Sequence, residues 1–150
     1  MARMLREDLS RNFGFLVNDV ARAMRTEYDR RVRELGLTRS QWWVMNHLFR
    51  NPGLTQSELA EILEVEKPSV GRLLDRLEAK GLVRREHDAR DRRAWRVYIA
   101  EAAEPQMRAL RKRAGELMSD ALAGLSAADR ERLIDLLLAV KANLARRNGS

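Results

Sequence analysis

Cysteine is absent from this chain of 150 residues, which also has only two histidines, three prolines and eight glycines. The lack of cysteine excludes disulfides, thiolate nucleophiles, iron–sulfur clusters and cysteine-ligated zinc, and leaves His47 and His87 as the only imidazoles. No apolar run approaches the roughly 20 residues that span a bilayer, and residues 1–10 lack the apolar stretch of a signal peptide. We therefore expect no metal, no cofactor, no membrane contact and a cytoplasmic location.

Charged residues are abundant, and positive charges outnumber negative ones. The chain has 29 Lys and Arg against 22 Asp and Glu, a formal net charge of +7, and 45% of its residues are hydrophobic. That hydrophobic share can form a core, and the few prolines and glycines are typical of a helix-rich protein. The length fits one domain, or one core with an added oligomerisation element.

Hydrophobic periodicity predicts one long helix near the N-terminus and two near the C-terminus. Apolar residues recur every three or four positions over residues 13–35, before Gly36, and the same spacing follows Pro105 and Ser126. These apolar stripes are far apart in sequence, and each needs a partner surface to be stable. We expect a homodimer whose N- and C-terminal helices interlock, with a monomeric bundle as the alternative.

Three short helices are predicted in the middle of the chain. Thr38 and Thr55 each precede a Gln or Glu by three residues, which is the capping-box spacing at a helix start. A third helix starts at Glu66, with Pro68 in its first turn, and ends at Gly81. The residues expected to face inward on the second and third helices are Leu59, Ile62, Leu63, Val70, Leu73, Leu74 and Leu77.

A β-hairpin is predicted after the short helices. Residues 82–86 and 95–99 are strand-like, and the polar run 87–93 separates them. The predicted fold class is therefore mainly α, with a small β-wing. Positive charge is concentrated in the same region, since residues 67–96 have 10 basic and 5 acidic side chains. A local cationic surface of this kind is typical of a nucleic-acid site.

The second and third short helices, joined by a tight turn, form a helix-turn-helix whose second helix can enter a DNA major groove about 12 Å wide. Arg72 can donate two hydrogen bonds to guanine, Ser69 can reach a base or a phosphate, and Gly71 permits close approach of the backbone. The alternative is an ordinary corner between two helices with a solvated charged face. The candidate recognition residues are Lys67, Pro68, Ser69, Arg72 and Arg76.

Arginines crowd the predicted hairpin loop. Their mutual repulsion is unfavourable for stability, but it suits insertion into the negative minor groove of DNA. Asp91 lies two positions before Arg93, where a carboxylate can hold the guanidinium as a bidentate pair. Arginines on the strands are expected to contact phosphates, and a solvated basic loop is the alternative. The candidate wing residues are Arg84, Arg85, Arg90, Asp91, Arg92, Arg93 and Arg96.

Two segments carry a resemblance to a known family: LTRSQWWVMNHL at residues 37–48, and residues 54–105, which include LLDRLEAKGLV and Asp91-Arg92-Arg93. They resemble the MarR family of winged-helix transcription regulators, most closely its SlyA-like branch. The resemblance covers nearly the whole chain and implies an obligate dimer with interlocked terminal helices and two DNA-binding lobes on a palindromic site. Residues 98–101 depart from the family, which usually has a Leu-Thr pair there that caps the next helix.

The resemblance also implies roles for single residues. Arg72 matches the arginine that reads the major groove, Arg93 the arginine that enters the minor groove, and Asp91 its orienting partner. The oxidant-sensing branch uses a cysteine, which this chain lacks. Many relatives respond to small aromatic carboxylates or phenols, which suit an aromatic wall with one cation, although core packing is the alternative. The candidate effector-pocket residues are Arg22, Trp42, Trp43 and His47.

We predict an N-terminal dimerisation helix at residues 1–36, a winged helix-turn-helix DNA-binding domain at 37–104 and C-terminal dimerisation helices at 105–150. The predicted function is a nucleoid-associated regulator, a repressor or an activator, that binds a pseudo-palindrome in double-stranded DNA. The alternative is an architectural DNA-binding protein without base-specific readout. We expect that the protein is not an enzyme, because HExxH, P-loop, GxGxxG and GxSxG motifs are absent from the sequence. Asp88 and Asp91 are better explained as ion-pair partners than as catalysts.

Overall fold

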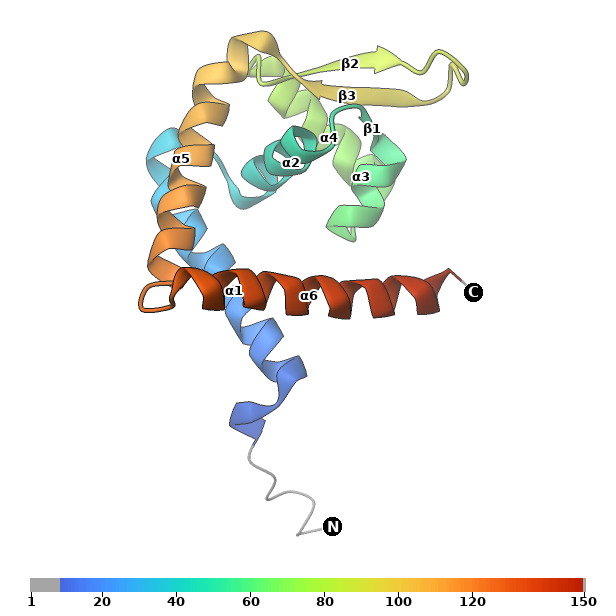
Figure 1. The fold of residues 1–150 in the computed structure, drawn as a ribbon. Coiled ribbons are helices and arrows are strands. Elements are labelled where there is room, and N and C mark those ends of the chain that lie inside the picture. Colours follow the sequence, from blue (N-terminus) through green and yellow to red (C-terminus); the bar gives the residue numbers. More distant parts are fainter. Residues whose placement is uncertain (1–8, 150) are drawn as a thin grey trace. The chain divides into compact units, whose positions relative to one another are not determined.

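The structure, a computed structural model, describes residues 9–149 (Figure 1). The predicted order of a long helix, three short helices, a hairpin and two long helices is confirmed, as is the mainly α fold class with a small β-sheet. Two compact units divide after Gly115, within α5. The helices are α1 (Phe13–Val32), α2 (Arg39–Arg50), α3 (Gln56–Leu63), α4 (Lys67–Ala79), α5 (Glu104–Ala121) and α6 (Ala127–Asn148), and the strands are β1 (Leu54–Thr55), β2 (Val83–His87) and β3 (Trp95–Ile99).

Side-chain caps are present at the predicted starts of α2, α3 and α6. Thr38 Oγ1 accepts a hydrogen bond from the backbone N–H of Gln41, and Gln41 Oε1 accepts one from the N–H of Thr38, which completes the capping box of α2. The hydroxyls of Thr55 and Ser126 cap α3 and α6 in the same way, without the reciprocal bond. Short sequence signals of this kind therefore predicted the helix boundaries correctly.

The sheet contains a strand that the sequence did not predict. Its order is β1-β3-β2, with both pairings antiparallel, and Leu54 of β1 lies opposite Val97 of β3. β1 is two residues long, too short to show an alternating pattern. A 3-10 turn, Glu101–Ala103, follows β3 without a side-chain cap and leads directly into α5. The departure from the family's Leu-Thr pair therefore does not prevent α5 from forming.

The first unit has its core between α2, α3, α4, the sheet and the start of α5. One predicted core residue is wrong: Ile62 is 37% exposed, and Ala60 is buried beside Leu59 and Leu63 instead. At 3.6 residues per turn, an inner face centred near Leu63 leaves Ile62 at its edge, and Leu73 is half-buried on α4 for the same reason. The fully buried large side chains are Val32, Val44, Met45, Leu48, Leu59, Val70, Leu74, Leu77, Val97 and Leu110.

Polar contacts join the end of α1 to α2 and α5. Asp29 accepts hydrogen bonds from Arg39 Nε and from the indole Nε1 of Trp42, each at 2.6 Å. The buried Trp42 ring packs edge-on against Tyr28, and the Tyr28 hydroxyl donates to the carbonyl of Leu110 at 2.9 Å. Burial alone raises the pKa of Asp29, but the bonds from Arg39 and Trp42 outweigh it, so the pKa lies below its ordinary value.

Asp29→Asn is expected to lower the free energy of unfolding by about 1–2 kcal/mol at neutral pH, because it removes a charged acceptor from two donors. The folded-state pKa is lowered, so this contribution is fully present above the ordinary pKa of 3.8 and is lost as the pH falls through the folded value. Urea unfolding of both proteins from pH 7 to pH 3 measures it. The difference should shrink in acid, and a difference that does not change with pH contradicts the assignment.

A control for this prediction is Asp19→Asn. Asp19 pairs with Arg22 on the open surface of α1, and both side chains are mostly exposed. Exposed pairs of this kind contribute little to stability. The Asp19 variant is therefore expected to unfold at the same urea concentration as the wild type throughout the pH range.

Two helices carry large apolar side chains that are exposed within residues 9–149. In α1 the N-terminal half exposes Phe13, Phe15, Leu16, Val17 and Val20, whereas Tyr28 and Val32 in its C-terminal half are buried. In α6 no side chain is buried, and its exposed apolar residues are Leu133, Ile134, Leu136, Leu137, Leu138 and Leu144. Within residues 9–149, no helix is both long and apolar enough to cross a membrane.

Candidate nucleic-acid interface

The first half of α4 presents polar side chains at its surface. A left-handed residue, Glu64, ends α3, and α4 then begins at Lys67 with Pro68 in its first turn. Lys67, Pro68, Arg72 and Arg76 are exposed, and Ser69 is half-buried with its Oγ 3.2 Å from Arg72 Nη2, which donates to it. Val70, Leu74 and Leu77 anchor the opposite side of the helix in the core. The helix therefore holds a serine–arginine pair outward on a rigid support.

The wing is the β2–β3 hairpin, and its loop contains the three exposed arginines Arg90, Arg92 and Arg93. Figure 1 shows the hairpin reaching past the helices of the first unit. The Arg93 side chain is 96% exposed. A guanidinium this exposed, on a protruding loop, can enter a groove without leaving a buried site.

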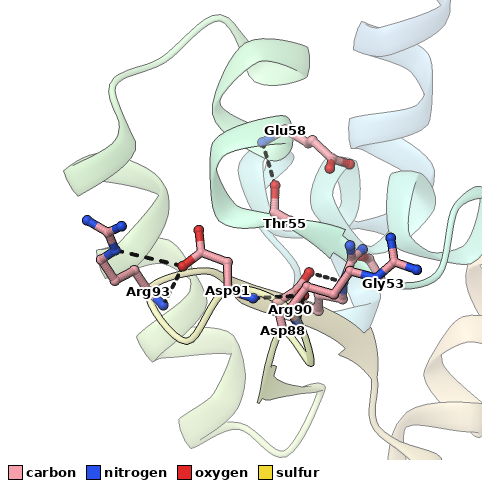
Figure 2. Close-up of polar contacts among 8 residues, drawn as sticks. Gly53, Thr55, Glu58, Asp88, Arg90, Asp91 and Arg93 are labelled. Atoms are coloured by element: carbon pink, nitrogen blue, oxygen red, sulfur yellow. Dashed lines mark hydrogen bonds and ion pairs between the residues drawn. The ribbon is translucent and has the colours of Figure 1, made fainter.

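Asp91 acts differently from the predicted bidentate clamp. Its Oδ1 accepts a hydrogen bond from the backbone N–H of Arg93 at 3.0 Å, and lies 3.8 Å from Arg93 Nε (Figure 2). The predicted pairing of Asp91 with Arg93 is present, but as a single contact and not as a bidentate one. Asp91 fixes the backbone of the turn and holds the guanidinium loosely.

Asp88 is an ion-pair partner, as predicted, and it also organises the loop backbone, a role that we did not predict from the sequence. Its Oδ1 accepts from the backbone N–H groups of Arg90, at 2.7 Å, and Asp91, at 3.3 Å, and its Oδ2 accepts from Arg96 Nε at 2.7 Å (Figure 2). The bond from Arg90 is the main reason that the pKa of Asp88 lies below its ordinary value. An aspartate two residues before an exposed loop tip is a known turn former, and that spacing was the available signal.

Arg85 and Arg96, predicted to contact phosphates, are bound to protein groups. Arg85 is 20% exposed and donates to Asp75 Oδ1 at 2.6 Å, Glu78 Oε2 at 3.0 Å and Gln56 Oε1 at 3.3 Å. Arg96 donates to Asp88 and, through Nη1, to the carbonyl of Gly53 at 2.8 Å. These bonds give both arginines a structural role but use only part of the five N–H donors of each guanidinium, so phosphate contact by Arg85 and Arg96 stays a prediction. Strand position alone could not show this, because the acceptors come from distant helices and loops.

Arg84 lies on the opposite face of β2 from Arg85. Its guanidinium carbon is 4.5 Å from the centre of the Tyr98 ring, and it pairs with Glu86. Half of its side chain is exposed. The contact of Arg84 with DNA phosphates stays a prediction.

Arg85→Ala is expected to lower the free energy of unfolding by about 1–2 kcal/mol, because it leaves three acceptors on α3 and α4 without their donor and removes the clamp between α4 and β2. Thermal unfolding followed by circular dichroism measures the change. Arg84→Ala is the matched control, since it removes the neighbouring guanidinium from the other face. Equal stability of the wild type and Arg85→Ala would show that the clamp is not formed in solution.

The four candidate effector residues have different surroundings. Trp42 is buried, Arg22 pairs with Asp19 on its own helix, and burial next to Arg50 lowers the pKa of His47. Trp43 does line a cavity, of about 510 Å³, between α2 and α4. The other lining residues of this cavity are Thr38, Ser40, Gln41, Leu63, Val65, Ser69, Arg72, Leu73 and Arg76. Its cations therefore come from α4 rather than from Arg22, because long-range packing brings α4 against α2.

Among residues 9–149 there is no group of three or more His, Asp or Glu side chains placed to hold a metal ion. The site is built from helices α3 and α4 and the β2–β3 wing, all in the first unit. This arrangement is a winged helix-turn-helix.

Comparisons with known proteins agree with this class. The family model of the MarR family matches residues 35–94. The solved structure of transcriptional regulator PA3341 is 38% identical, with 89% of this chain and 98% of that chain aligned at a TM-score of 0.78. The chain belongs to the MarR family of transcriptional regulators.

Two further structures are similar. The transcriptional regulator SlyA is 26% identical over 91% of this chain and 96% of that chain, with a TM-score of 0.74. A MarR family regulator from Listeria monocytogenes, crystallised with 26mer DNA, is 22% identical over 91% of both chains, with a TM-score of 0.77. At 22% identity, the similarity to the Listeria monocytogenes protein shows a shared fold.

Proposed function

We propose that this MarR-family regulator binds a pseudo-palindromic site in double-stranded DNA as a homodimer, with α4 in the major groove and the wing loop in the minor groove. One observation carries the proposal: a single lobe displays both the outward Ser69–Arg72 pair and the highly exposed Arg93. The DNA complex of the Listeria monocytogenes relative, which shares the fold, supports it. A regulator of this kind binds chromosomal DNA in the cytoplasm. Its proposed function is DNA binding, without catalysis.

Each proposed contact has a physical role. Arg72 reads a base edge in the major groove, where its two parallel donors match guanine O6 and N7. Lys67, Pro68, Ser69 and Arg76 form the rest of the α4 surface, with Lys67 placed to neutralise a phosphate. Arg90, Arg92 and Arg93 enter or flank the minor groove, which is most negative where it is narrow.

The homodimer is supported by the exposed apolar faces of α1 and α6. A helix of 22 residues without one buried side chain, carrying six exposed large hydrophobic residues, is not stable by itself in water. Two-fold symmetry is the commonest way to cover such faces. A two-fold dimer would place its two α4 helices on half-sites about one helical turn apart, roughly 34 Å.

The cavity beside α4 supports a ligand-responsive regulator. It combines an indole wall from Trp43 with the guanidinium groups of Arg72 and Arg76, which suits a small aromatic carboxylate or a phenol. Because Arg72 would serve both the ligand and the DNA, binding of one would weaken binding of the other by the same factor. The proposed effectors therefore remain small aromatic carboxylates and phenols, but the cavity that would bind them is lined by Trp43, Arg72 and Arg76.

Selection of duplexes from a random pool tests the DNA-binding proposal. Repeated rounds of binding should enrich a two-fold symmetric motif whose half-sites are about one helical turn apart. The architectural alternative predicts enrichment of flexible or A·T-rich DNA without a motif. A pool that stays random after several rounds would contradict base-specific recognition.

A further inference from the structure

We propose that Asp88 and Arg96 are positioning residues that anchor the wing loop to the end of α2, so that the minor-groove arginines are held in one place. The role in DNA recognition rests on the proposed function, but the anchoring itself is a property of the free protein. The proposal gives Arg96 a role besides phosphate binding. It also gives Asp88 a role in DNA recognition, although Asp88 is negatively charged, like DNA.

The anchor is a continuous set of hydrogen bonds. The Gly53 carbonyl, in the turn that follows α2, accepts from Arg96 Nη1 at 2.8 Å, and Arg96 Nε donates to Asp88 Oδ2 at 2.7 Å. The other carboxylate oxygen of Asp88 accepts from the backbone N–H groups of Arg90 and Asp91. The Asp88 side chain therefore bonds both to the loop tip and, through the planar Arg96 guanidinium, to the turn between α2 and β1.

Burial and backbone bonds support the anchor. The Asp88 side chain is 11% exposed although it lies in a protruding loop, and its backbone N–H donates to the Ala94 carbonyl at 2.9 Å. On the same arm of the loop, His87 Nδ1 donates to the Arg92 carbonyl at 3.0 Å, and the His87 ring lies against Trp95, with 3.7 Å between ring centres and the rings tilted by 31°. The loop is thus closed within itself, while Arg96 ties it to Gly53.

The receiving end of the anchor is also fixed. Gly53 has a positive φ of 84°, and its N–H donates to the Val97 carbonyl at 3.0 Å. A Cβ at this position would lie 3.0 Å from the Tyr98 hydroxyl, so a side chain would be strained by the backbone conformation and would require the Tyr98 ring to shift. Because the Gly53 carbonyl is held in place, its bond to Arg96 can fix the wing loop and the orientation of the loop arginines.

The test uses the sign of the effect of Asp88→Ala on DNA affinity. Removing a carboxylate from a DNA-facing loop should strengthen binding if only its charge matters, since it reduces repulsion of the phosphates. The anchor predicts the opposite, about tenfold weaker binding to the selected duplex, because the arginines lose their fixed placement. The matched control is Glu86→Gln, which removes an acidic charge from the same hairpin without touching the loop bonds.

The conservative variant Asp88→Asn separates geometry from charge. It is as neutral as Asp88→Ala, but its amide oxygen can still accept from Arg90 and Asp91. The anchor therefore predicts that Asp88→Asn recovers part of the lost affinity. Equal affinities of the two neutral variants, or stronger binding by Asp88→Ala, would overturn the proposal.

Amide hydrogen exchange of the full-length protein, without DNA, tests the anchor independently of the proposed function. In Asp88→Ala the N–H groups of Arg90 and Asp91 should exchange about tenfold faster, while core amides such as Leu74 keep their wild-type rates, which shows that the variant is folded. Unchanged exchange at Arg90 and Asp91 would overturn the anchor. Absence of DNA binding by the wild type would refute the proposed function, and the exchange rates would still decide the anchor.

Discussion

Leu137→Glu is expected to convert the homodimer into monomers and to abolish tight operator binding. Leu137 lies on the exposed apolar face of α6, together with Leu133 and Leu144. In the proposed dimer this face is covered, and a carboxylate buried there without a partner costs several kcal/mol. The dimer dissociation constant should therefore rise by at least about a hundredfold, and sedimentation velocity at micromolar concentration measures the change.

The matched control is Ala139→Glu, which adds the same carboxylate to the opposite side of α6, since two residues correspond to about 200° around the helix. This variant should remain dimeric and should bind DNA like the wild type. The loss of DNA binding by Leu137→Glu follows from the loss of the second lobe, because a linked pair of lobes binds two half-sites far more tightly than one lobe binds one. A dimeric Leu137→Glu, or a monomeric wild type, would contradict the proposed assembly.

Arg72→Ala is expected to weaken binding to the selected duplex by about 1–3 kcal/mol per half-site, which is roughly 5- to 150-fold, and to relax the preference at one base pair of each half-site. Arg72 is exposed on α4 and is held by Ser69, so its removal leaves the buried face of the helix unchanged. Titration of duplexes with single base-pair substitutions measures both effects.

Two comparisons make this result interpretable. Arg108→Ala removes an exposed arginine that pairs with Glu104 on α5, and should leave DNA affinity unchanged. A phosphate contact, unlike a base contact, weakens binding to all sequences alike and lowers the dependence on salt. Equal loss of affinity for selected and scrambled DNA would therefore remove Arg72 from the base-reading residues.

Local signals in the sequence predicted most of the elements. The Thr38–Gln41 capping box and the Thr55 and Ser126 caps lie within four residues of the bonds they form, so spacing alone identifies them. Helical periodicity likewise predicted the long helices. It was less reliable for faces: Ile62 has the right spacing but lies at the edge of the buried surface, because the position of the inner face depends on the packing partners.

The candidate site was predicted in outline and not in detail. The exposed residues of α4 and the arginines of the wing loop lie where the sequence placed them. The structural roles of Arg85 and Arg96 were missed, because Asp75, Glu78, Asp88 and Gly53 become their partners only after the chain folds. An arginine in a basic segment can bind phosphate or organise the protein, and the position of its acceptors decides between the two.

Fluorescence anisotropy of the wild type on the selected duplex and on a scrambled duplex, each at two salt concentrations, tests the central claim most directly. We expect at least about a thousandfold preference for the selected duplex, and a fall in affinity for both duplexes as salt increases. Equal affinity for the two duplexes would contradict sequence-specific recognition and would favour an architectural DNA-binding protein.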